Sequence, residues 1–211
     1  MHESQVGQYA YGLWGLVIIN VGLFIGFLFS FAKPTTKMEW HSLGLFSSFI
    51  VALFVEMYGF PLTIYLLTSW LGSRYPVVNP FSHENGHLLG IFFGIRSDHG
   101  TVLHLLSNIL IFAGAILIAQ GWNAVHRGRG LMVTDGPYKY VRHPQYAGFI
   151  AIIIGFLIQW PTLVTIIMAP ILIIRYIRLA KREETDMLKQ FPKDYLEYMQ
   201  TVSAWIPKLS Q

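Results

Sequence analysis

The stretch AGFIAIIIGFLIQWPTLVTIIMAPILII, residues 147–174, is apolar almost throughout, and Gln159-Trp160-Pro161 interrupts it near the middle. A helix needs about 20 apolar residues to cross a hydrocarbon core about 30 Å thick, so the run exceeds a single span. A proline that follows a polar residue inside such a run is typical of a tight turn between two helices. We therefore predict a helical hairpin over residues 147–178, with a short first arm.

Three further apolar runs precede the hairpin, at residues 11–32, 41–71 and 101–121. The second run is long for one helix, and Glu56, Gly59 and Pro61 interrupt it, which predicts a single tilted or kinked span. We therefore predict an all-α integral membrane protein with about five transmembrane segments. The sequence has no internal repeat or flexible linker, so we expect one domain over residues 1–211.

The composition also indicates a membrane environment. Hydrophobic residues make up 54% of the chain, charged residues 12%, and the mean hydropathy is +0.48, whereas soluble domains average about 25% charged residues. Cysteine is absent, which excludes disulfides, thiolate zinc sites and a cysteine nucleophile. The start MHESQVGQYA has no Lys or Arg and does not resemble a secretory signal, so we expect the first apolar run to remain.

The positive charges favour one orientation. With the N-terminus outside, the cytoplasmic parts are residues 33–40, 122–146 and the tail from 175, which hold thirteen of the fifteen Lys and Arg residues. The predicted outer parts hold two. This asymmetry follows the positive-inside rule and predicts a cytoplasmic C-terminus. It also accounts for the net charge of +4 without a nucleic-acid partner.

Polar side chains gather on the predicted cytoplasmic side, before the hairpin. Asp135-Gly136-Pro137 is a turn signal, and Tyr138, Arg142, His143 and Tyr146 then recur at intervals that place them on one side of a helix. Pro144 suits the first turn of the helix that enters the membrane. The alternative interpretation is interfacial anchoring, because Tyr and Arg are favoured at membrane surfaces.

A second polar group follows the hairpin. Glu183-Glu184 comes just after Arg175, Arg178 and Arg182. Adjacent helical residues point about 100° apart, so we expect one glutamate to face a pocket and the other to pair with an arginine. The alternative is a solvated run of mixed charges that makes i,i+4 pairs.

These motifs resemble a known family. LMVTDGPYKYV at 131–141, RHPQYAG at 142–148, the apolar hairpin and REETDMLKQFPKDYLEY at 182–198 occur in the order found in isoprenylcysteine carboxyl methyltransferases and the related small phospholipid methyltransferases. The resemblance covers residues 122–208, and residues 1–121 carry no comparable motif. One departure is Pro192, where many members have glycine after the phenylalanine.

The resemblance implies an S-adenosylmethionine-dependent membrane methyltransferase with a cofactor pocket at the cytosolic surface and a lipophilic or lipidated substrate that arrives from the bilayer. The residues it implies for cofactor binding are Leu131, Met132, Val133, Tyr138, His143, Tyr146 and one glutamate of the pair, assigned as Glu183. Those it implies for catalysis are Arg142, His143, Arg178 and Glu184, with Arg178 at the polar end of the substrate. A carboxylate acceptor needs no base, whereas an amine, thiol or phenol must lose a proton, for which His143 or a glutamate is suited.

Three other functions stay open at this point. A membrane reductase of the sterol type, which binds a nicotinamide cofactor, has a similar C-terminal region. In a non-catalytic membrane protein or transporter, Glu56 would be the central residue, because an ionisable group in mid-span is often functional. The structural alternative is that Glu56 hydrogen-bonds backbone groups freed by Gly59 and Pro61. HENGH at 83–87 has the His-Glu-x-x-His spacing of zinc peptidases. We expect no metal there, since Gly86 weakens the required helix and the motif falls on the predicted outer side.

Overall fold

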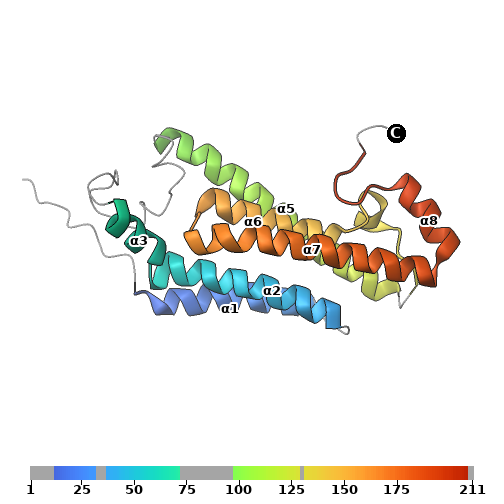
Figure 1. Ribbon diagram of the computed structural model, residues 1–211, viewed down its shortest axis with the longest axis horizontal. Helices are drawn as coiled ribbons and strands as arrows, with labels where there is room; N and C mark the ends of the chain where they lie inside the picture. The colour runs from blue at the N-terminus through green and yellow to red at the C-terminus, as the bar shows by residue number, and fades with distance from the viewer. Residues whose placement is uncertain (1–11, 32–36, 72–96, 129–130, 209–211) are drawn as a thin grey trace, which may run out of the picture.

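The computed structural model describes residues 12–31, 37–71, 97–128 and 131–208 (Figure 1). Its helices are α1 (Trp14–Phe31), α2 (Lys37–Phe54), α3 (Leu62–Leu71), α5 (Ser97–Gly128), α6 (Pro144–Gln159), α7 (Leu163–Gln190) and α8 (Pro192–Thr201). A π-helical turn, η1 (Val55–Gly59), follows α2, and a 3-10 turn, η4 (Gly136–Lys139), precedes α6. Within these ranges the β-type pairing is one isolated bridge between Val141 and Ser203. The predicted all-α class is confirmed.

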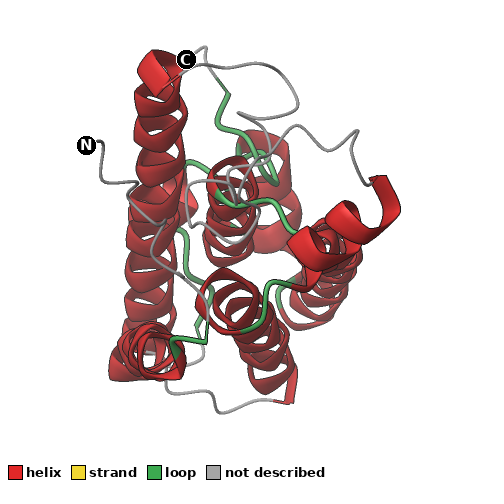
Figure 2. Cartoon of the chain, turned by 90° about the vertical axis from the view of Figure 1, so that its left-hand side faces the viewer, coloured by secondary structure: helices red, strands yellow, loops and turns green. Residues whose placement is uncertain are grey.

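Three helical stretches are long and apolar enough to cross a membrane: Trp40–Gly59, Val102–Gly128 and Leu163–Gln190. Two shorter apolar helical stretches, Trp14–Gly26 and Pro144–Gln159, accompany them. Figure 1 shows α1 and α2 along one side of the bundle and α6 and α7 beside them, with α8 at the far end. Figure 2, turned by 90°, looks along several of these helices and shows them packed around one another. The chain is an integral membrane protein by this measure.

The predicted interruption near Glu56 is present, and it breaks the helix. The π turn widens the helix at Val55–Gly59, and α3 begins only after Phe60 and Pro61. Glu56 is buried, and its two carboxylate oxygens accept from the Thr63 backbone N–H and from Thr63 Oγ1, each at 3.0 Å. Thr63 Oγ1 in turn accepts from the Leu163 backbone N–H at 2.8 Å. Glu56 thus joins the start of α3 to the start of α7.

The predicted hairpin is also confirmed. Helix α6 ends at Gln159, where the Trp160 N–H donates to the Phe156 carbonyl, and Pro161 follows before α7. Thr162 caps α7 through a reciprocal pair of bonds with Thr165, which satisfies backbone donors that the helix cannot. At the other end, Pro144 stands in the first turn of α6, where its missing N–H costs nothing.

Glycines allow α5 to lie directly against α6. A Cβ on Gly114 would meet the Gly148 carbonyl oxygen at 2.6 Å, and a Cβ on Gly155 would meet the Ser107 carbonyl oxygen at 3.0 Å. The Ser107 hydroxyl also donates to Gln159 Oε1 at 3.0 Å. Because the small residues recur every seven positions on each antiparallel helix, the two backbones stay close over several turns.

Helix α5 continues to Gly128, seven residues beyond the apolar run predicted to span the membrane at 101–121. Residues 122–127 contain no proline or glycine, so the helix carries on past the apolar run. The extension places Val125 beside the loop that leads to η4, and that loop carries part of the site.

Candidate active site

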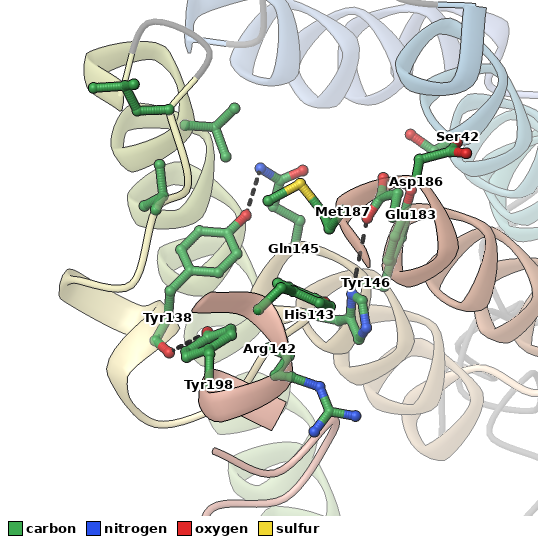
Figure 3. A pocket seen from close by; sticks show the side chains of 14 residues that line it. Ser42, Tyr138, Arg142, His143, Gln145, Tyr146, Glu183, Asp186, Met187 and Tyr198 are labelled. Carbon is green, nitrogen blue, oxygen red and sulfur yellow. Dashed lines mark hydrogen bonds and ion pairs between the residues drawn. The ribbon is translucent and has the colours of Figure 1, made fainter. Parts of the chain in front are cut away.

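A cavity of about 250 Å³ lies at the meeting point of four elements: η4, the first turn of α6, the last turns of α7, and α8 (Figure 3). Ser42 of α2 and Val125 of α5 complete its wall. The residues that line it are Ser42, Val125, Leu131, Val133, Tyr138, Arg142, His143, Gln145, Tyr146, Glu183, Asp186, Met187, Tyr195 and Tyr198. Segments far apart in the sequence therefore supply one cavity with carboxylates, phenols, an imidazole and apolar side chains.

Arg142 and His143 both bind Glu184. Glu184 Oε1 lies 2.9 Å from Arg142 Nε, 2.8 Å from Arg142 Nη2 and 2.9 Å from His143 Nε2. An oxygen that accepts from a guanidinium in this way belongs to an ionised carboxylate, so the His143 proton resides on Nε2. The Nδ1 atom is then an acceptor, 3.8 Å from Glu183 Oε2.

Arg142 also holds the C-terminal segment in place. Its Nη1 donates to the backbone carbonyls of Met199 at 3.2 Å and Val202 at 2.7 Å, at the end of α8. Its backbone N–H donates to the Ser203 carbonyl at 2.9 Å, next to the Val141–Ser203 bridge. In Figure 3 the guanidinium points away from Gln145 and Met187. With Nε, Nη1 and Nη2 all bonded within the protein, Arg142 acts as a clamp between α7, α8 and the start of α6.

Glu183 has a different environment from its neighbour. Its Oε1 accepts from the Tyr146 hydroxyl at 2.6 Å, and the side chain lines the cavity (Figure 3). The Tyr146 ring is buried and stacks on Tyr176, with ring centroids 5.7 Å apart. Glu184 pairs instead with Arg142, which lies just before α6. One glutamate faces the pocket and the other pairs with an arginine, as expected, but the arginine is Arg142 and not a member of the run at 175–182.

Burial controls the protonation of the aromatic groups around the cavity. It lowers the pKa of His143, although the bond to Glu184 opposes this effect. Burial, followed by the charge of Glu184, raises the pKa of Tyr195 to about 12, and burial also raises the pKa of Tyr198. The imidazole and both phenols are therefore neutral near pH 7.

The phenols also fix the loop against α8. The Tyr198 hydroxyl donates to the Tyr138 backbone carbonyl at 2.6 Å, and Gln145 Nε2 donates to the Tyr138 hydroxyl at 3.3 Å (Figure 3). Gly136, with φ of +59°, makes the turn that starts this loop segment. The Tyr138 ring is thus positioned from both α6 and α8.

The structure brings most of the predicted site residues to this cavity, namely Leu131, Val133, Tyr138, Arg142, His143, Tyr146 and Glu183. They do not lie on one helix as the spacing suggested, because Tyr138 belongs to η4 and His143 only caps α6. Glu184 stands just behind the lining, bonded to His143.

Besides Glu184, two predicted residues do not line the cavity. Met132 lies between the lining residues Leu131 and Val133 in a non-helical segment but does not itself line the cavity. Arg178 is exposed on α7, and its five-residue separation from Glu183 turns it about 140° around the helix. The HENGH motif at 83–87 lies outside the described residues.

Sequence reasoning missed several lining residues. Asp186 and Met187 follow Glu183 by three and four positions, so helical spacing alone could have identified them. Gln145 lies inside the motif, and Tyr195 and Tyr198 carried the resemblance without an assigned role. Nothing in the sequence marks Ser42, which comes from the N-terminal half.

Two comparisons with known proteins bear on this part of the chain. Residues 101–189 match the model of the Isoprenylcysteine carboxyl methyltransferase (ICMT) family. The chain is also similar to the cobalt-zinc-cadmium resistance protein CzcN of Cupriavidus metallidurans, with 30% identity over 129 residues. That alignment covers 58% of this chain and 59% of the relative, so the match spans less than two thirds of CzcN. The match over residues 101–189 supports an isoprenylcysteine carboxyl methyltransferase-like family for this part of the chain.

Proposed function

We propose that the protein transfers a methyl group from S-adenosylmethionine to a lipophilic acceptor at the cytosolic face of a membrane. The observation that carries this proposal is the cavity itself, since it unites Arg142-His143-Pro144, Glu183 and the α8 tyrosines inside or beside the family match. In this proposal the five apolar helical segments all serve as membrane segments, and the distribution of Lys and Arg supports a cytosolic cavity.

The lining residues fit the chemistry of this cofactor. S-adenosylmethionine, when bound, supplies a methyl group activated by a sulfonium. The carboxylates of Glu183 and Asp186 suit its ammonium and ribose hydroxyl groups, because ionised acceptors make the stronger hydrogen bonds. The phenol rings of Tyr138 and Tyr195 suit its adenine, and Leu131 supplies apolar surface.

The protein's own contribution is to position and desolvate the reacting groups. Glu184 fixes the His143 ring through Nε2, and Tyr146 fixes Glu183, so both cavity-facing groups are oriented in advance. An enclosed site at the membrane edge also strengthens charge interactions by lowering the local dielectric constant.

The acceptor determines the chemical role of His143. A carboxylate acceptor is already ionised and needs only to be bound. An acceptor that must lose a proton would have His143 Nδ1 as its base, because the ring is neutral and Nε2 is committed to Glu184. Arg178 stays a predicted contact for an anionic acceptor, on the exposed side of α7.

Calorimetry of the full chain with S-adenosylmethionine, in detergent and in lipid nanodiscs, tests the proposal directly. We expect saturable binding that Glu183→Gln weakens and that the exposed Lys193→Gln leaves unchanged. Methyl-labelled cofactor should then label a lipophilic acceptor from membrane extracts. Absence of binding in both environments, or displacement of the cofactor by a nicotinamide dinucleotide at similar concentration, would overturn the methyltransferase assignment in favour of the reductase alternative or a non-catalytic role.

A further inference from the structure

A second cavity, of about 650 Å³, lies on the other side of η4. Leu117 and Gln120 of α5, Lys139 and Tyr140 of the η4 segment, and Trp205 of the C-terminal tail are among its lining residues. None of its lining residues also lines the cavity that contains His143 and Glu183. The proposed methyl transfer therefore gives this cavity no role.

The cavity stands at the end of a lipid-accessible stripe on α5. Ile109, Phe112 and Ile116 are 55%, 67% and 55% exposed, and their spacing places them on one face of α5 together with Gln120. From Val102 to Gln120 the helix rises about 27 Å at 1.5 Å per residue. A hydrocarbon core is about 30 Å thick, so Gln120 comes near its boundary.

The lining combines one cation with interfacial aromatic residues. Among the described residues that line the cavity, Lys139 alone carries a formal charge, and Gln120 adds an amide. Lys208, just beyond the lining in the tail, already donates its Nζ to the Gln200 carbonyl at 3.0 Å. Tyr140 and Trp205 are residue types favoured at the headgroup level of a bilayer. A cation at that level attracts anionic lipids.

We propose that this cavity binds the headgroup of an anionic membrane phospholipid, with an acyl chain lying on the Ile109–Phe112–Ile116 stripe. The charge of Lys139 selects an anionic headgroup, and the stripe selects an amphiphile over a free anion, since one exposed lysine alone attracts a small ion weakly. The Trp205 ring centroid lies 5.5 Å from that of His143. A bound lipid therefore packs against the side chain that backs the imidazole.

Native mass spectrometry of the full chain in detergent, titrated with phosphatidylglycerol without cofactor, tests this proposal. We expect Lys139→Gln to weaken binding about fivefold, the effect of one lysine near an anionic surface. The control Lys193→Gln removes an exposed charge at the same end of the bundle, outside the lining, and should bind as the parent protein does. Ile116→Gln should also weaken binding, because it interrupts the stripe.

Four results would overturn the lipid site. Equal losses in Lys139→Gln and Lys193→Gln would mean general surface charge. Equal binding of phosphatidylcholine with the same acyl chains would remove the headgroup preference. Displacement of the lipid by equimolar glycerol phosphate would indicate a free-anion site. Unchanged binding in Ile116→Gln would remove the acyl chain from the stripe. Because no arm uses S-adenosylmethionine, failure here is distinguishable from failure of the proposed methyl transfer.

Discussion

Two carboxylate networks, of which only the first is fully buried, occupy opposite ends of the α6–α7 hairpin. At the hairpin turn, Glu56 accepts from Thr63, and Thr63 accepts from the Leu163 N–H. The void beside them measures only about 10 Å³, room for a single water molecule at most. At the other end, Glu183 and Glu184 bond three side chains and adjoin a cavity of about 250 Å³. The first network is closed on itself, whereas the second opens onto space for a ligand.

This difference distinguishes a carboxylate that holds helices together from carboxylates that face or support a ligand site. Each oxygen of Glu56 bonds Thr63, within a network that ties α3 to α7, so the structure favours the structural interpretation of this glutamate. It lies near the end of the Trp40–Gly59 span and not in mid-span, as the sequence suggested. In the second network Arg142 and Glu184 bind protein groups, Glu184 holds His143 at the cavity wall, and Tyr146 holds Glu183 there. The four predictions below test whether the two networks really differ in this way.

The largest effect is expected from Arg142→Ala. The change leaves Glu184, with its side chain 17% exposed, bonded to His143 Nε2 but without its guanidinium partner, and it removes the Arg142 donor from the carbonyls of Met199 and Val202. We expect the free energy of unfolding to fall by on the order of 3 kcal/mol and cofactor binding to be lost, since removing one member of a mostly buried pair strands the other. Thermal unfolding in detergent and calorimetry measure the two effects.

Arg178→Ala provides the matched control for that change. It removes an exposed arginine from α7, so we expect little change in stability and an intact cofactor Kd. Any effect should appear as a raised KM for an anionic acceptor. If the two variants behave alike, Arg142 is not the clamp that the hydrogen bonds indicate.

The next effect in size concerns the closed network. Glu56→Ala removes the acceptor of the Thr63 N–H and hydroxyl in a buried position, which should cost about 2 kcal/mol of unfolding free energy. Glu56→Gln keeps one acceptor oxygen and should cost less. Neither variant should alter the cofactor Kd measured on folded protein. A specific loss of binding or of solute transport in the stable Glu56→Gln protein would instead make this glutamate functional.

The sequence alone predicts much of this fold, because hydrophobic length and helix breakers are local signals. The hairpin at Gln159-Trp160-Pro161 and the interruption near Glu56 were both readable in this way. The close contact between α5 and α6 was not, since Gly114 has no small residue four positions away. Its partners are Gly148 and Ile152 on another helix, and only the tertiary structure brings them within reach.

The sequence predicted which residues belong to the site better than it predicted how they are arranged. The motif identified His143, Tyr146 and Glu183 as members of one cavity, which the structure brings together. The motif could not indicate that the Arg142 guanidinium donates to the end of α8. Its acceptors there are backbone carbonyls, which every residue has, so no residue type marks them. The sequence did not identify Ser42 either, because contact between α2 and the cavity depends on long-range packing.

A smaller effect should separate the two adjacent glutamates. Glu183→Gln keeps the size of the side chain and an acceptor for Tyr146, so stability should change little, while cofactor affinity falls about tenfold through the loss of one charge-assisted bond. Glu184→Gln should do the reverse: it weakens the Arg142 pair and lowers stability, with a smaller change in affinity on the folded protein. Calorimetry and thermal unfolding of both variants decide the assignment. Affinity losses in the opposite order would exchange the roles of the two residues.

The smallest effect is a dependence of stability on pH through His143. Burial lowers the pKa of this imidazole below its ordinary value of 6.5, and the bond to Glu184 limits the shift. Between pH 6.5 and the lowered pKa, the unfolded chain takes up a proton that the folded protein does not, so the free energy of unfolding falls as the pH falls. Above pH 6.5 the ring is neutral in both states and contributes no slope. His143→Gln should therefore lose part of the decline in thermal stability that the parent protein has below pH 6.5. If the parent protein instead gains stability relative to His143→Gln as the pH falls, the imidazole is charged in the folded state, and Nδ1 could not serve as the base for an acceptor that must lose a proton.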